Sequence, residues 1–142
     1  MAGVLIVEDE IFVALDIEHI LISAGFEVVG IAQDRKSAMA LAIDCNVALI
    51  DVNLHDGATG PSIGMDIAAR HGAEIIFVTS HPFLVGEAAQ IASGVISKPF
   101  RPDMIIDTVR RALDGGRGVE ARNEDPAFLS QSESSSGNQL QS

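Results

Sequence analysis

Five polar residues of the chain each stand directly after a short apolar run or close behind one, and their types could do chemistry together: Glu8, Asp9, Asp51, Thr79 and Lys98. An unbroken apolar run is typical of a strand that is buried on both faces, so these residues mark the places where strands leave a sheet. The clearest case is Asp51, which ends the run 47–50. A carboxylate at such a position needs a physical reason.

Carboxylates that gather in one place repel one another unless they are protonated or bind a cation. All-oxygen ligands with room for water suit Mg²⁺, or Mn²⁺ in its place. Glu8 and Asp9 are a tandem pair suited to holding the ion, whereas Asp51 stands alone and is the better nucleophile. The hydroxyl of Thr79 and the charge of Lys98 would stabilise the equatorial oxygens of a transferring phosphoryl group. The predicted product is an aspartyl phosphate at Asp51.

A simpler interpretation of the acidic residues stays open. Glu8, Asp9 and Glu10 would also favour the N-terminal dipole end of a following helix without any metal. That alternative is strong for each residue alone. It is weak for the whole set, because capping does not explain why all five polar residues fall at the same ends of their strands.

The elements expected to position these residues alternate between strand and helix. Strands are predicted over 4–7, 27–32, 47–54, 75–78 and 94–97, and helices over 10–24, 34–43, 61–72, 84–92 and 102–114. Two helices have predicted buried stripes, namely Val13, Ile17, Ile20, Leu21 and Ala24 in the first, and Ile106, Val109 and Leu113 in the last. This order predicts an α/β fold, a parallel sheet with helices on both faces, and a ligand site at the carboxyl ends of the strands.

Composition narrows the class of protein. The chain has 142 residues, which fits one domain over 1–115, and 116–142 is so polar that we predict a disordered C-terminal tail. A net charge of -11 with only 9 Lys and Arg argues against direct DNA binding. The single cysteine, Cys45, excludes an internal disulfide and is expected to be a core thiol. No secretion leader or membrane span is evident, so we expect a cytoplasmic protein without membrane insertion.

The ordered combination of motifs resembles the receiver domain of bacterial two-component response regulators, of the stand-alone, single-domain type. The resemblance rests on four segments: 4–10, 50–54, 79–80 and 98–100. It implies a flavodoxin-like, doubly wound, five-stranded parallel sheet in the order 2-1-3-4-5. It also implies that Asp51 is the phosphoacceptor for a phosphohistidine of a sensor histidine kinase or phosphotransfer protein, and that the Lys98–Pro99 bond is cis.

The same resemblance implies roles for the neighbouring residues. Glu8, Asp9, Asp51 and the backbone carbonyl of Asn53 would hold Mg²⁺, while Thr79 would move onto the phosphoryl group. The chain would be a signalling domain that catalyses only its own phosphorylation and dephosphorylation. Its output would be a contact with an unknown downstream protein, or a step in a phosphorelay.

Several residues are expected to modify this scheme. Val95 stands where receivers usually carry an aromatic residue that follows the Thr inward, so we expect the segment 79–92 to carry the switch instead. His81 is a candidate for positioning or shielding water at the acyl phosphate, although an exposed loop histidine would look the same. Phe12, Asp16 and His19 are expected to contact the phosphodonor protein, and the remaining histidines are interpreted as surface residues.

Two competing functions are weighed against this one. A small aspartyl-phosphate phosphatase-type enzyme would need an acid or base near its nucleophile, but Asn53 stands two residues after Asp51, and no cap insertion is evident. A flavin or dinucleotide carrier would need a glycine-rich phosphate loop after the first strand, where Glu8, Asp9 and Glu10 stand instead. Both alternatives are therefore less favoured than a receiver.

Overall fold

The computed structural model describes residues 2–115, so the predicted tail lies outside the described residues. Its strands are β1 (Gly3–Val7), β2 (Glu27–Ala32), β3 (Val47–Asp51), β4 (Glu74–Thr79) and β5 (Ala92–Ser97). The helical segments between and after them are α1 (Ile11–Ser23), α2 (Arg35–Ala42), α3 (Gly60–His71), η1 (Pro82–Gln90) and α4 (Pro102–Leu113). All strand pairs are parallel, and the sheet order is β2-β1-β3-β4-β5. The predicted fold class and strand order are confirmed.

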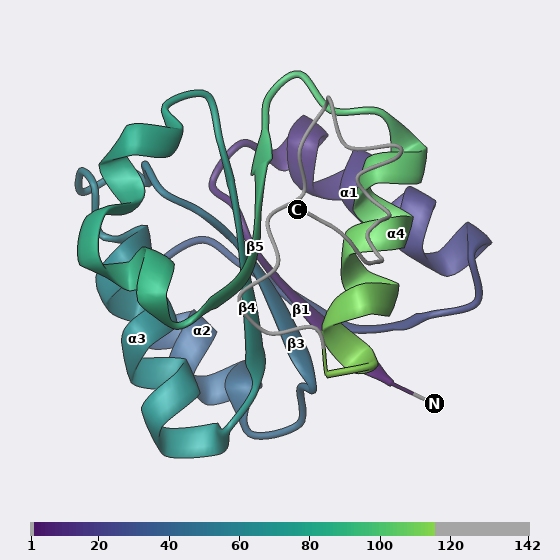
Figure 1. Cartoon of the computed structure of the whole chain (residues 1–142), viewed down its shortest axis with the longest axis horizontal. Coiled ribbons are helices and arrows are strands. Elements are labelled where there is room, and N and C mark those ends of the chain that lie inside the picture. The colour runs from purple at the N-terminus through teal and green to yellow at the C-terminus, as the bar shows by residue number, and fades with distance from the viewer. Residues whose placement is uncertain (1, 116–142) are drawn as a thin grey trace, which may run out of the picture.

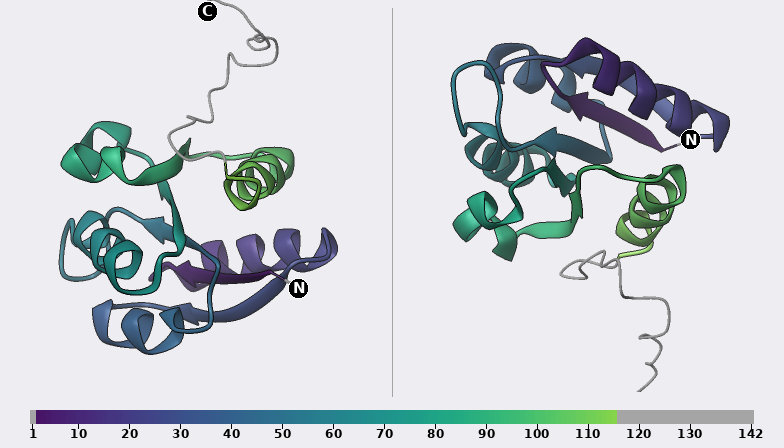
Figure 2. Two further views of the ribbon diagram at one scale, coloured as in Figure 1. Left: turned by 60° about the horizontal axis from the view of Figure 1, so that its bottom comes forward. Right: turned by 90° about the horizontal axis from the view of Figure 1, so that it is seen from above.

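The sheet is the middle layer of three (Figures 1 and 2). Helices α1 and α4 cover one face, and α2, α3 and η1 cover the other. Within β1, Leu5 and Val7 pack on the α2–α3 side, while Val4 and Ile6 pack on the α1–α4 side. Because both faces are covered, every position of the strand must be apolar, which is why the sequence shows continuous runs rather than alternation.

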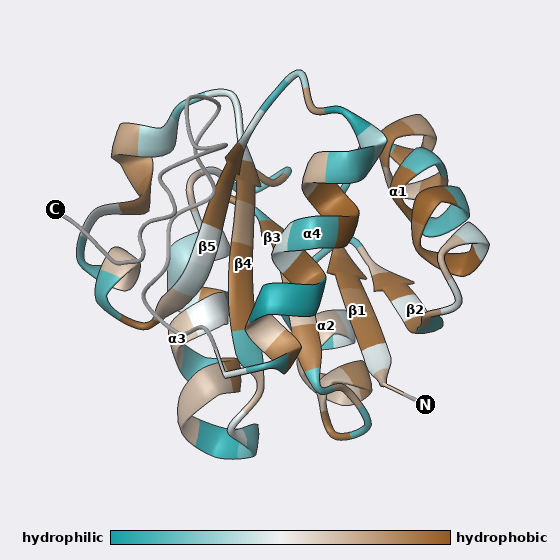
Figure 3. Ribbon diagram, turned by 45° about the vertical axis from the view of Figure 1, so that its right-hand side comes forward, coloured by the Kyte–Doolittle hydropathy of each residue, from teal (hydrophilic) through white to brown (hydrophobic). Residues whose placement is uncertain are grey.

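Figure 3 shows the central strands as an apolar layer. In α1 the buried residues are Ala14, Ile17, Ile20 and Leu21, whereas Val13 and Ala24 of the predicted stripe are only half-buried. In α4 the buried stripe is Ile105, Thr108, Val109 and Ala112, so Ile106 and Leu113 were predicted wrongly and are half-buried. Ile105 and Val109 are apolar as expected of a buried face, whereas Thr108 and Ala112 are only weakly marked by hydrophobicity.

The continuous helix predicted over 84–92 is wrong. Residues 82–90 form short 3₁₀ turns interrupted at Gly86, whose φ of 61° and ψ of -136° are not helical. Gly86 disfavours a regular helix in so short a segment, because glycine is a poor helix former and here adopts a positive φ. Strand β5 begins at Ala92, two residues before its predicted start.

Other helix ends match the sequence pattern. The side chain of Asp34 accepts a hydrogen bond from the Ser37 backbone N–H, which caps α2. Gly72 ends α3 with a φ of 69°, and Pro61 lies in its first turn. Among residues 2–115, no helix combines the length and apolar character that crossing a bilayer requires.

One glycine sets the distance between α3 and the end of β3. A Cβ atom at Gly60 would lie 2.1 Å from the carbonyl oxygen of Asp51, so only glycine fits there. The Gly60 backbone N–H donates to the Val52 carbonyl at 3.0 Å. The start of α3 therefore supports the backbone that carries Asp51.

Candidate functional site

The sheet register brings the predicted site residues to one edge. Val7 of β1 pairs with Ile50 of β3, so the residues that follow them, Glu8 and Asp51, leave the sheet side by side. On the other side of β3, Asp51 pairs with Val78, which places the end of β4 next in line. Because the strands are parallel, all these ends point the same way.

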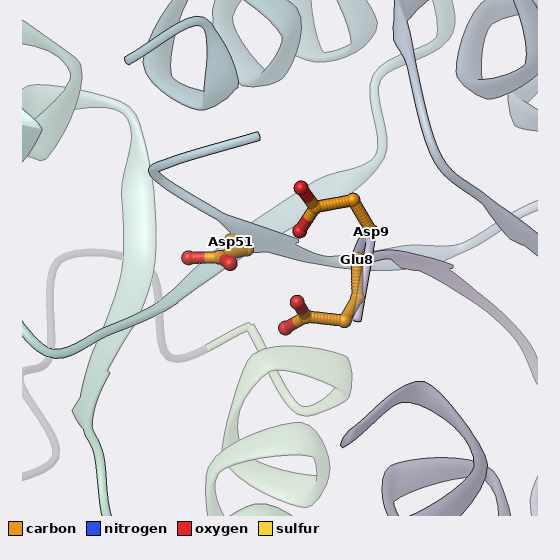
Figure 4. A group of neighbouring side chains, drawn as sticks. All are labelled: Glu8, Asp9 and Asp51. Carbon is orange, nitrogen blue, oxygen red and sulfur yellow. The ribbon is translucent and has the colours of Figure 1, made fainter. Parts of the chain in front are cut away.

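Three carboxylates converge there. Glu8, Asp9 and Asp51 each offer an oxygen within 4.8 Å of the oxygens of the other two. Figure 4 shows Glu8 and Asp9 extending from the end of β1 toward Asp51 at the end of β3. Glu8 is 1% exposed and Asp51 is 8% exposed. So close a group of buried carboxylates needs positive charge nearby.

Lys98 supplies part of that charge. Its Nζ donates to Glu8 Oε1 at 3.1 Å and to Asp51 Oδ2 at 3.4 Å. The Lys98 backbone N–H donates to the Thr79 carbonyl, and the following peptide bond to Pro99 is cis, as the resemblance implied. Burial lowers the pKa of Lys98, but attraction to Glu8 and Asp51 outweighs it, so the net shift is upward. Lys98 is therefore a fixed positive charge.

Backbone N–H groups hold the remaining oxygens. The Glu10 N–H donates to Glu8 Oε2 at 3.1 Å, and the Asn53 N–H donates to Asp51 Oδ1 at 3.3 Å. Even so, burial and the neighbouring Asp51 charge raise the pKa of Glu8 to about 7. A carboxylate pushed this far toward its neutral form would be relieved by a cation.

The donor set fits Mg²⁺. With its acids ionised, the cluster carries three negative charges, and Lys98 offsets one of them, which leaves the charge that a divalent ion neutralises. Carboxylate oxygens on an open rim suit an ion that keeps several of its waters. Glu8, Asp9 and Asp51 are the side chains that would hold the ion.

The cluster opens into a cavity of about 380 Å³. Its lining residues are Asp9, Glu10, Asp51, Asn53, Leu54, Ser80, His81 and Lys98. Thr79 is not among them: it is fully buried at the end of β4, and its Oγ1 accepts the His81 N–H at 3.0 Å. Ser80 therefore lines the cavity, although the sequence predicted that Thr79 would do so. The predicted modulating residue His81 also lines the cavity.

The structure also places a residue that sequence reasoning left on the surface. His55 Nδ1 lies 3.5 Å from Asp9 Oδ2, although the His55 side chain is 77% exposed. The two residues are far apart in the chain, and the contact depends on how the loop after β3 folds back. A histidine four residues after Asp51 in a loop at the carboxyl end of the sheet was the only available signal.

A second hollow adjoins the site. Phe12, Val13, Asp16, Lys98, Pro99 and Phe100 line a cavity of about 420 Å³ between α1 and the loop after β5. Phe12 is 85% exposed. Of the residues expected to contact a phosphodonor protein, Phe12 and Asp16 therefore lie together beside Lys98, while His19 is exposed elsewhere on α1 and does not line this hollow.

Val95 lies away from the cavity. It pairs with Phe77 of β4 and packs, half-buried, against the core on the α2–α3 side. A branched aliphatic side chain in this place fills space next to the sheet, and it has no ring to rotate.

Comparison with known proteins agrees with this geometry. Residues 4–110 match the family model described as the response regulator receiver domain. The phyllosphere-induced regulator PhyR of Methylorubrum extorquens is 33% identical in an alignment over 128 residues that covers 84% of this chain and 48% of PhyR. The chain thus spans about half the length of that curated relative.

Two solved structures are also similar. The REC domain of the Erythrobacter litoralis PhyR response regulator superposes with a TM-score of 0.72 at 28% identity, covering 80% of this chain and 90% of that one. The anti-anti-sigma factor PhyR of Bartonella quintana superposes with a TM-score of 0.70 at 31% identity, covering 81% of this chain and 49% of that one. Both likenesses extend over most of residues 2–115.

Proposed function

The chain belongs to the response regulator receiver domain family, and on that premise we propose that it accepts a phosphoryl group on Asp51 from a phosphohistidine of a sensor histidine kinase or phosphotransfer protein. The observation that carries the proposal is that Asp9, Asp51 and Lys98 line one open cavity, while the buried carboxylate of Glu8 lies within 4.8 Å of the other two acids and accepts from Lys98. The hydrogen bonds of Lys98 to Glu8 and Asp51 support the proposal, because they hold the positive charge next to the proposed phosphoacceptor.

In the proposed reaction, a carboxylate oxygen of Asp51 attacks the phosphorus atom. An O–P bond forms while the N–P bond to the donor imidazole breaks, and the electron pair of that bond stays on the nitrogen, which then takes a proton. Lys98 Nζ, already within 3.4 Å of Asp51, donates to the oxygens that gain negative charge. The Thr79 hydroxyl is buried and accepts the His81 N–H, so we propose that the Thr79 side chain turns toward the cavity before it donates to a phosphoryl oxygen.

We propose that Glu8, Asp9, Asp51 and the backbone carbonyl of Asn53 hold Mg²⁺ or Mn²⁺. When bound, the ion supplies charge neutralisation on the phosphoryl oxygens. Glu8 is fixed from two sides, by Lys98 and by the Glu10 N–H, so it enters the site already oriented.

The output that fits the family is a contact with a downstream protein or a phosphorelay step, rather than turnover of a small molecule. Asn53 stands where a phosphatase-type enzyme would carry an acid or base, and it offers only an amide. One similar structure is named an anti-anti-sigma factor, and this chain covers about half of that protein. We therefore propose that this chain corresponds to the receiver part of such a regulator, and that its downstream partner is a protein.

The test is phosphorylation of the full chain by phosphoramidate with MgCl₂, read by intact mass. The wild type should gain one phosphoryl group, which hydroxylamine should remove, as expected of an acyl phosphate. Asp51→Asn should gain none, while Asp107→Asn, an exposed acid on α4, should behave as the wild type. Equal labelling of the wild type and Asp51→Asn, or no labelling of the wild type, would refute the proposal.

A further inference from the structure

Among residues 2–115, the imidazole of His55 is the histidine ring within ion-pair distance of the acidic cluster. Its Nδ1 lies 3.5 Å from Asp9 Oδ2, and Asp9 lines the same cavity as Asp51. The imidazole is exposed to solvent, so it is not held there by packing in the core. Its position is set by the loop between β3 and α3.

That loop is pinned by backbone hydrogen bonds. The Leu54 N–H donates to the Gly57 carbonyl at 2.9 Å, and the Gly57 N–H donates back to the Leu54 carbonyl at 3.0 Å, so His55 and Asp56 form the tip of a tight turn. The side chain of Leu54 is buried and anchors one end of the turn in the core. His55 therefore reaches the site from a fixed backbone position, and only its side chain needs to rotate.

We propose that His55 Nδ1 is an additional ligand of the metal ion, one that favours Mn²⁺ and other transition-metal ions over Mg²⁺. This inference depends on the proposed metal site. Neighbouring ligands of an octahedral ion with bonds of about 2.1 Å lie about 3 Å apart, and opposite ligands lie about 4 Å apart. The present separation between Nδ1 and Oδ2 falls between these values, so one ion can join both atoms after a small rotation of the ring.

The chemistry of the donors sets the preference. Carboxylates and water suit Mg²⁺, which gives up its bound waters reluctantly. Imidazole nitrogen suits transition-metal ions. Without His55 the site offers oxygen atoms alone. With His55 it becomes a mixed nitrogen and oxygen site, and the affinity increases most for the ions that bind nitrogen more strongly.

The test uses the full chain with MnCl₂ and measures pulsed electron paramagnetic resonance for coupling between Mn²⁺ and a directly bound nitrogen. The wild type should show this coupling, and ¹⁵N labelling of histidine should change its frequency. His55→Ala should lose the coupling and bind Mn²⁺ at least roughly 10-fold more weakly, because removing even an outer-shell partner of a ligand costs about that much, with a smaller change for Mg²⁺. His81→Ala, which removes the imidazole that lines the cavity, should keep the coupling.

The outcomes separate this inference from the proposed function. If the wild type binds Mn²⁺ but shows no nitrogen coupling, His55 is not a ligand, and the proposed oxygen site stands. If His55→Ala binds either ion more tightly, the imidazole competes with the metal for Asp9, and the inference is wrong. If neither ion binds the wild type or His55→Ala, the proposed metal site itself fails.

Discussion

At the scale of single residues, Glu8 stands out because it is buried next to another acid. Its pKa is about 7 in the folded protein, against an ordinary value of 4.5. Between these two pH values the folded chain holds a proton that the unfolded chain has lost, so the free energy of unfolding falls as pH rises. With EDTA present to remove metal ions, we expect the ionisation of Glu8 to lower the free energy of unfolding by about 1–3 kcal/mol between pH 5 and pH 8.

Urea unfolding of the wild type and Glu8→Gln over this pH range measures the effect. The amide cannot ionise, so the difference in unfolding free energy between the two proteins should change with pH in favour of Glu8→Gln. Saturating Mg²⁺ should oppose the loss in the wild type, because the ion stabilises the charged carboxylate. A difference that stays constant from pH 5 to pH 8 would contradict the prediction.

Phe12 is a residue whose exposure the fold does not explain. It lies over the hollow beside Lys98 and Phe100, and burying it against a partner would remove apolar surface from water. Phe12→Ala should leave the unfolding free energy within about 0.5 kcal/mol of the wild type, as is usual for a surface site. It should slow phosphotransfer from a histidine donor protein severalfold, while phosphoramidate labelling stays unchanged. Ile43→Ala, at the exposed end of α2, is the control, and an equal slowing there would argue against a specific contact.

His81 lies at the cavity wall and stacks on Phe83, with 5.9 Å between the ring centroids. In this position it can shield the acyl phosphate or place a water molecule against it. We predict that His81→Ala changes the half-life of phosphorylated Asp51 severalfold, measured as loss of the phosphoryl mass with time. His71→Ala, at the far end of α3, should not change it. An unaltered half-life for His81→Ala would reduce His81 to an exposed loop residue.

At the scale of elements, predictability follows burial. The strands could be located from the sequence because both faces of the sheet are covered, and apolar runs then leave few alternatives. The buried face of α4 could not be located in full from the sequence, because Thr108 and Ala112 are buried although neither residue is strongly hydrophobic. The contact of His55 with Asp9 could not be predicted for a different reason. It depends on how the loop after β3 folds in three dimensions, which no local sequence pattern encodes.

Segment η1 is the element where sequence pattern and structure differ most. It is broken at Gly86, and its exposed side chains Phe83 and Leu84 make little use of the core. Only Val85 and Ala88 anchor the segment in the core, and its helical hydrogen bonding is interrupted at Gly86, so we expect low local stability here. Because Val95 offers no ring that could turn inward, we expect this segment to respond when the site is occupied.

Hydrogen exchange with and without beryllofluoride and Mg²⁺ tests this expectation. Amides of 80–91 should exchange several times more slowly, or faster, when the phosphoryl mimic is bound, while those of α2 should stay unchanged. The Thr79 carbonyl and hydroxyl connect the segment to Lys98 and His81, which gives a physical route. Identical exchange of 80–91 in both states would show that the switch lies elsewhere.

At the scale of the whole molecule, the buried core residues of the described part of the chain, residues 2–115, form two layers between Val4 and Ala112. One layer joins the sheet to α2, α3 and η1, and the other joins it to α1 and α4, whose last buried residue is Ala112. Cys45 belongs to the first layer, and burial raises the pKa of its thiol to about 11. Because the composition of 116–142 is polar, we predict that the domain over residues 2–115 folds without this segment.

A chain cut after Gly115 should therefore have a free energy of unfolding within about 0.5 kcal/mol of that of the full chain, and it should bind Mg²⁺ with the same affinity. A chain cut after Val109 is the matched comparison: it loses Ala112 and the last turn of α4, and it should unfold at much lower urea concentration because β4 and α1 lose their cover. Urea unfolding and calorimetric Mg²⁺ titration measure both quantities. If cutting after Gly115 costs as much as cutting after Val109, residues 116–142 contribute to the folded domain, and its boundary lies further along the chain.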